Sequence, residues 1–145
     1  ETQTMFDPSR DQARQFFIET WRKHRAQEVL TPLEHMTADL LLAHPEYHPL
    51  LEDPESVGRD FTPEDGQINP FLHLSLHLAI EEQLSIDQPP GIRPAFATLQ
   101  LRLGDRHQAM HQVLECLGET IWEAQQGAKP LDGAAYLERI RKRAR

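Results

Sequence analysis

The sequence lacks the features that mark secreted, disulfide-stapled or membrane-spanning proteins. Its single cysteine, Cys116, excludes an internal disulfide framework and fits a reducing cytoplasm. No apolar run approaches the roughly 18 residues that a membrane helix needs, and no charged-then-apolar signal segment opens the chain. We therefore expect a cytoplasmic protein without a membrane partner, in which Cys116 is a small buried hydrophobe.

The sequence also has few alternating apolar–polar segments and few basic residues, and both facts limit the class of protein. No segment alternates apolar and polar residues for long, so strands are not expected. Basic residues are also scarce: 15 Lys and Arg stand against 23 Asp and Glu, for a net charge of −8, which argues against a nucleic-acid partner. The exception is the basic run at residues 139–145. We interpret it as a helix C-terminus that faces the negative end of the helix dipole, with a tail for RNA or a membrane as the alternative.

Apolar residues recur at three- and four-residue spacing, which predicts amphipathic helices. One such pattern covers residues 9–25. Residues 31–34, Thr-Pro-Leu-Glu, form a capping box that begins a second helix, and Pro45 should end this helix near His44. A third helix, over residues 69–85, opens on Asn-Pro and is apolar on most sides, which indicates a central, buried helix.

Breaks in the pattern separate the remaining segments. The Pro-rich residues 45–68 predict a long, mostly irregular crossover with one short helical turn at most. Gln-Pro-Pro-Gly at residues 88–91 is a sharp break. The helical pattern that follows, to residue 126, should be interrupted at Gly104, where Asp105 begins a new capping box. Asp132 should cap a last short helix.

Together these patterns predict an all-α fold: a compact helical bundle of five to six helices with a long Pro-rich crossover. The length favours one domain, over residues 5–145. Residues 1–4, which precede the first methionine, are expected to be added or disordered residues outside that domain.

Histidines occur in an unusual arrangement. The chain has eight, and six of them form His-x-x-x-His pairs: His44/His48, His73/His77 and His107/His111. Glu81 and Glu115 continue the second and third pairs at the same spacing. Since each step of four residues turns only about 40° around a helix, each triplet places two imidazoles and a carboxylate on one helical face. Iron, manganese and zinc use such ligands.

Helical projection places His73 and His107 in the middle of core-facing stripes. His77 and His111 lie beside them, and the two glutamates flank the stripes. Burying these groups without partners would cost about 1–3 kcal/mol each. A bound metal would satisfy them, and the alternative is a His–Glu hydrogen-bond network without metal.

The pair His44/His48 differs because Pro45 opposes a regular helix across it. A helix end that turns into a loop can still present His44, Glu46 or His48 to the interior, so both histidines stay candidate ligands. Glu34 is interpreted as a capping residue. His24 and His35, which have no partner at helical spacing, are interpreted as surface or helix-end residues.

The number of candidate ligands bears on the kind of metal site. It is too large for one tetrahedral zinc and suits a two-metal cluster, or one metal with outer hydrogen-bond partners. Glu-x-x-His pairs are missing, which argues against a ferritin-like di-iron site. We favour iron as the cofactor, with zinc or manganese as alternatives.

Several motifs together resemble a known family. They include the run Asn69-Pro-Phe-Leu-His-Leu-Ser-Leu-His-Leu-Ala-Ile-Glu-Glu-Gln-Leu, His44-Pro-Glu-Tyr-His48 and Phe17-Ile-Glu-Thr-Trp-Arg-Lys23. With them the chain resembles, over nearly its whole length from Met5, the bacterial family known as domain of unknown function 1841. The resemblance implies a small bacterial cytoplasmic protein and implies no activity.

The residues support a metal-binding helical bundle as the first hypothesis for function. Its candidate ligands are His73, His77, Glu81, His107, His111, Glu115, His48 and His44, and its chemistry would be oxygen-linked, redox or hydrolytic. The rivals are a non-enzymatic adaptor module with an internal His–Glu network, and a pH-sensing bundle. Whether the protein is an enzyme, which small molecule it would act on, and whether it forms a homodimer are left open by the sequence.

Overall fold

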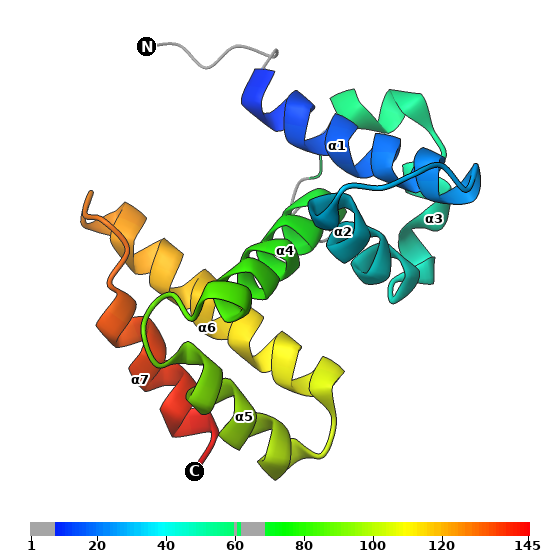
Figure 1. The fold of residues 1–145 in the computed structure, drawn as a ribbon. Coiled ribbons are helices and arrows are strands. Elements are labelled where there is room, and N and C mark those ends of the chain that lie inside the picture. The colour runs from blue at the N-terminus through cyan, green and yellow to red at the C-terminus, as the bar shows by residue number, and fades with distance from the viewer. Residues whose placement is uncertain (1–7, 60, 62–68) are drawn as a thin grey trace. The chain divides into compact units, whose positions relative to one another are not determined.

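The computed structural model describes residues 8–59, 61 and 69–145, and all regular structure in these ranges is helical. This confirms the all-α prediction, and the described ranges contain seven α-helices in place of the five to six expected (Figure 1). The chain divides into two compact units, Glu1–Leu78 and Ala79–Arg145, and the division falls within helix α4 (Pro70–Ile86). The expectations for residues 1–4 and for the last part of the crossover lie outside the described residues.

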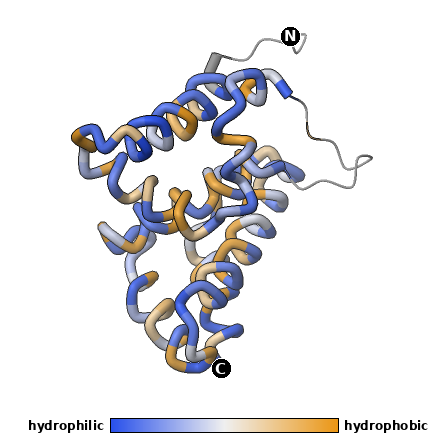
Figure 2. Tube along the Cα trace, turned by 90° about the vertical axis from the view of Figure 1, so that its right-hand side faces the viewer, coloured by the Kyte–Doolittle hydropathy of each residue, from blue (hydrophilic) through white to orange (hydrophobic). Residues whose placement is uncertain are grey.

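The N-terminal unit is built on two longer helices, α1 (Pro8–Arg25) and α2 (Pro32–Leu42), followed by short turns and the first part of α4. Its core gathers large apolar side chains from all of these elements. They are Phe17, Trp21, Leu40, Leu41, Leu51, Phe71 and Leu74. Figure 2 shows such hydrophobic residues interleaved with hydrophilic ones along the helices, the pattern of amphipathic elements that bury one face.

Helix α2 begins and ends where its sequence predicts. The Thr31 amide donates to Glu34 Oε1 at 2.9 Å, and the Glu34 amide donates to Thr31 Oγ1 at 3.2 Å, so the reciprocal capping box is present. Lys23 Nζ of α1 also lies 2.9 Å from Glu34 Oε2. The interpretation of Glu34 as a capping residue is confirmed, and the helix stops at Leu42, three residues before Pro45.

The Pro-rich crossover is more regular than predicted. Between residues 45 and 58 it forms three short helical segments: η1 (Pro45–Tyr47), α3 (His48–Leu51) and η2 (Pro54–Gly58). Each has a proline in its first turn, where the missing N–H costs nothing. Prolines that look like breaks in the sequence therefore act as helix starts.

Arg14 of α1 forms hydrogen bonds with the end of this crossover. Its Nη1 donates to the carbonyls of Val57 at 2.8 Å and Arg59 at 2.7 Å, and its guanidinium carbon lies 4.9 Å from the ring centre of Phe71. The residue is 4% exposed. A buried cation that bonds two carbonyls and an aromatic face joins three segments of the unit at one point.

The C-terminal unit packs α5 (Ile92–Leu103), α6 (Arg106–Gln126) and α7 (Gly133–Arg143) against one another. The predicted interruption is confirmed: Gly104 takes a left-handed φ of 72°, and Asp105 Oδ1 accepts from the His107 amide at 2.8 Å. Asp132 caps α7 as expected, by accepting from the Ala135 amide at 3.1 Å. Cys116 is fully buried, and burial raises the pKa of its thiol.

Burial on two helices departs from the sequence prediction. On α4, Leu72 and Ile86 are exposed, so this helix is not buried all round. The buried stripe of α6 includes Met110, Val113 and Leu117, and His107 is exposed rather than central to the stripe. The α6 sequence carries apolar residues on more than one face, and the face that α5 and α7 cover decides which is buried.

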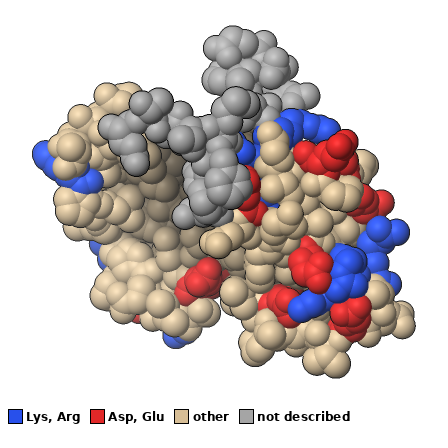
Figure 3. Space-filling view, turned by 90° about the horizontal axis from the view of Figure 1, so that it is seen from above, with Lys and Arg blue, Asp and Glu red and all other residues tan. Residues whose placement is uncertain are grey.

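Basic and acidic side chains lie next to one another at the right of the face shown in Figure 3. Two of the basic residues near the C-terminus form ion pairs with glutamates. Arg139 and Arg143 of α7 each lie 2.5 Å from a glutamate of α6, namely Glu123 and Glu115. Among the described residues, no helix is long and apolar enough to cross a membrane.

We predict that Arg14→Ala destabilises the protein by about 2–4 kcal/mol, because it removes a buried cation and leaves two carbonyls without their donor. Urea unfolding measures this change. Arg22→Ala is the control on the same helix, since Arg22 is half-exposed in its ion pairs with Glu19 and Glu28 and should contribute little. Equal midpoint shifts for the two variants would contradict the assigned role of Arg14.

The capping box also predicts a pH dependence. Hydrogen bonds from the Thr31 backbone and from Lys23 hold the pKa of Glu34 below its ordinary value of 4.5. The folded state therefore binds this proton less readily than the unfolded chain does. The stabilisation is complete above the ordinary pKa and is lost as the pH falls through the lowered one.

Glu34→Gln should accordingly flatten the fall in unfolding free energy as the pH drops below the ordinary pKa of 4.5, measured by urea titration at each pH. Glu55→Gln, which removes an exposed carboxylate of η2, is the matched control for the loss of one negative charge. An unchanged slope in Glu34→Gln would refute the assignment.

Candidate metal centre

His73 and His77 lie one turn apart on α4, and the start of this helix fixes where they point. Asn69 Oδ1 accepts from the amides of Phe71 at 3.0 Å and Leu72 at 3.2 Å, which places the N-terminus of the helix. The Nε2 atoms of His73 and His77 are 3.1 Å apart, so one ring donates a hydrogen bond to the other. His77 is 2% exposed and His73 is partly buried.

His44 reaches the same place from the end of α2. Pro45 opens η1, so His44 has left the helical conformation, with φ −126° and ψ 67°. Its ring centre lies 5.1 Å from that of His73 and 5.0 Å from that of His77, and the residue is 3% exposed. Ligand nitrogens of the three histidines all lie within 4.8 Å of one another. We call His44, His73 and His77 the histidine cluster.

The spacing in the histidine cluster suits coordination of one ion. Two imidazole nitrogens, each about 2.1 Å from a metal, are about 3.0–3.4 Å apart when they meet it at 90–109°. The two nitrogens on α4 already have this separation, at 3.1 Å. Their spacing follows from the helix, since residues four apart stand above one another on one face.

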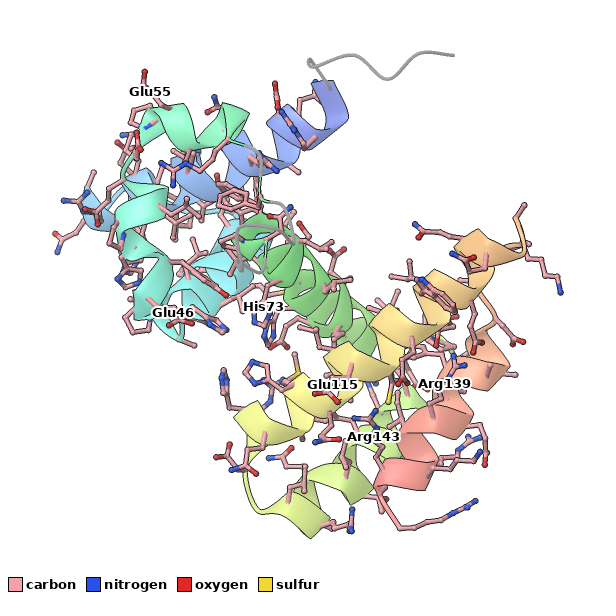
Figure 4. All side chains as sticks on the ribbon, turned by 180° about the vertical axis from the view of Figure 1, so that it is seen from behind. Glu46, Glu55, His73, Glu115, Arg139 and Arg143 are labelled. Carbon is pink, nitrogen blue, oxygen red and sulfur yellow. The ribbon has the colours of Figure 1, made fainter. Side chains whose placement is uncertain are left out.

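Glu46 and Tyr47 surround the His44 ring. Glu46 Oε2 lies 2.9 Å from Nδ1 of His44, and this hydrogen bond lowers the pKa of the Glu46 carboxyl. The Tyr47 ring stacks on His44 at an interplanar angle of 14°, with centres 5.4 Å apart, and burial raises the pKa of its phenol. Figure 4 shows Glu46 and His73 at the same end of the N-terminal unit.

His48 is turned away from the histidine cluster. Its ring stacks on Trp21 with centres 4.1 Å apart, and its Nε2–H donates to the Leu41 carbonyl at 2.8 Å. The turn of η1 lies between the two histidines of the pair, and it sends His44 toward α4 and His48 toward α1. His24, interpreted from the sequence as a surface residue, also stacks on Trp21.

The two glutamates of the predicted triplets are held by arginines. Arg106 donates through both Nη atoms to the two oxygens of Glu81, each at 3.0 Å, and Glu81 raises the pKa of Arg106. Arg143 donates to Glu115 at 2.5 Å, and its pKa is raised in the same way. As metal ligands, Glu81 and Glu115 stay predictions from the sequence.

The third pair keeps its spacing in the C-terminal unit. The ring centres of His107 and His111 are 4.2 Å apart, with His107 exposed and His111 partly buried. Two imidazoles one turn apart on a helix are a recurring chelating arrangement, so the pair stays a predicted donor set.

The sequence named Glu46 as a residue that the helix end could present to the interior, but it did not predict the contact with His44, and it gave no indication of Tyr47. Pro45, just before them, is the sequence feature that could have indicated their position. Once Pro45 breaks the helix, the next residues fold back in a tight turn beside His44, and a carboxylate two positions on comes within reach of its ring.

The fold and the site together define an all-helical protein with a buried cluster of histidines. A family model described as domain of unknown function (DUF1841) matches residues 9–142, so the chain belongs to that family. The expected resemblance is thereby confirmed. No curated protein and no solved structure matches the chain significantly.

Proposed function

We propose that this protein binds a transition-metal ion through His44, His73 and His77. The convergence of three imidazoles from two separate elements is the observation that carries the proposal. The rival is a network of histidines and glutamates without metal, and it would use the contacts of His44 with Glu46 and of His73 with His77. Glu81, the carboxylate that the sequence offered to such a network, is bound to Arg106 on both oxygens.

The donor atoms select among metals. Imidazole suits zinc, iron, copper and nickel, whereas magnesium, calcium and manganese favour oxygen ligands. With histidines as its ligands, the cluster fits zinc or ferrous iron ahead of manganese. Zinc therefore stands level with iron, which the sequence analysis had favoured.

The ligand count points to an open coordination position. Three protein ligands with a remaining site for water or substrate are typical of catalytic zinc, whereas structural zinc is closed by four. A bound ion would supply a Lewis acid for water or, as iron, a redox centre. On the sequence pattern, His107 and His111 stay proposed metal donors in the C-terminal unit.

Metal analysis tests the proposal directly. Protein purified without metal-affinity chromatography should contain about one zinc or iron per chain, measured by plasma mass spectrometry. Reloading stripped protein should raise its melting temperature, since a ligand at 100 times its Kd stabilises the folded state by about 2.7 kcal/mol. Substoichiometric metal with no thermal shift on reloading would overturn the proposal.

A matched pair of variants tests which histidine of the 44/48 pair binds. His44→Phe keeps an aromatic ring beside Tyr47 but removes the nitrogen ligand. His48→Phe keeps the ring on Trp21 and removes no proposed ligand. Calorimetric titration with zinc should show a loss of about 100-fold or more for the first, beyond the cost of losing an outer hydrogen-bond partner, and a near-unchanged Kd for the second.

His44→Gln, which is smaller, repeats the test if the phenylalanine does not fit. Equal Kd values for the His44 and His48 variants would contradict the ligand assignment.

A further inference from the structure

The hydrogen bond between His44 and Glu46 joins two unlike environments. His44 is 3% exposed, and the Glu46 side chain is 57% exposed. A carboxylate at the surface thus holds one nitrogen of an imidazole in the interior, at 2.9 Å. A partly solvated carboxylate stays ionised at little cost, and the buried ring gains a charge-assisted hydrogen bond.

This contact fixes which nitrogen of His44 binds. An ionised carboxylate only accepts, so Nδ1 carries the proton and Nε2 carries the lone pair. Metal-binding histidines commonly donate their second ring nitrogen to a carboxylate, which orients the ring and raises the basicity of the ligand nitrogen. The stacked Tyr47 ring restrains the same imidazole through its face.

We infer that Glu46 is a positioning residue of the metal site: it holds the His44 ring in the orientation and tautomer that present Nε2 as a ligand. The inference rests on the proposed metal binding. Within the N-terminal unit it gives the cluster two kinds of support. The α4 helix sets His73 and His77, and the Glu46 carboxylate with the η1 turn sets His44.

Glu46→Ala should weaken zinc binding by about 10- to 100-fold, the usual cost of losing such a partner, in calorimetric titration of stripped protein. Glu46→Gln keeps an acceptor oxygen for the Nδ1 proton and should lose less. Glu55→Gln removes one carboxylate from the other end of the same unit and should bind as the unsubstituted protein does (Figure 4). This control separates the hydrogen bond from the general effect of negative charge.

The tautomer of His44 gives a readout that needs no metal. Nitrogen-15 spectra of the stripped protein should show the His44 ring protonated at Nδ1, and in Glu46→Ala it should shift toward the Nε2-protonated form that is commoner in free imidazoles. Loss of a merely structural contact would lower the melting temperature without moving the tautomer.

The outcomes separate the two proposals. If the unsubstituted protein binds zinc and Glu46→Ala binds it within twofold as tightly, the role of Glu46 is refuted and the metal site stands. If the unsubstituted protein binds neither zinc nor ferrous iron, both fall. Equal losses in Glu46→Ala and Glu46→Gln would point to direct coordination by the carboxylate and overturn the positioning role.

Discussion

The end of α2 before Pro45 is the constraint on which the site depends. A proline disfavours the helical conformation of the residue before it, so His44 leaves the helix while its amide still bonds Leu41 at 3.1 Å. One backbone change then sets three side chains. It turns the His44 imidazole toward α4, folds the Glu46 carboxylate onto the Nδ1 side of that ring, and stacks Tyr47 on its face.

The distribution of polar groups follows the cost of burying each kind. A neutral imidazole can be buried if its nitrogens find partners, whereas an ionised carboxylate needs a cation or water. The histidine cluster is accordingly in the interior. In the C-terminal unit, Glu81 and Glu115 are held by Arg106 and Arg143. Each kind of polar group thus has suitable partners: the imidazoles contact one another in the histidine cluster, and these carboxylates bind cations.

The starts and ends of several helices were predictable from the sequence because each depends on a few neighbouring residues. The capping box at Thr31, the left-handed Gly104 and the cap at Asp132 all act within about one helical turn. The placement of His73 and His77 on one helical face was equally predictable, since residues four apart lie on the same face of a helix. The same reasoning overestimated irregularity in the crossover, because prolines serve as helix starts as well as breaks.

The buried face of α6 and the directions of the site side chains depend on tertiary contacts, which local sequence patterns do not show. Projection could not choose between two apolar faces of α6, and the packing of α5 and α7 placed His107 outside the buried stripe. Nor could it choose between His44 and His48, because the direction of each depends on the η1 turn and on Trp21. The glutamates were assigned by their spacing, while the arginines that hold them lie far away in sequence, 25 and 28 residues off.

X-ray absorption at the zinc edge of the reloaded protein tests the central claim most directly. The account predicts at least three nitrogen neighbours at about 2.0–2.1 Å, with the multiple-scattering pattern of imidazole rings, and the loss of one ring in His44→Gln. A first shell of oxygen alone, or a spectrum that His44→Gln leaves unchanged, would contradict it.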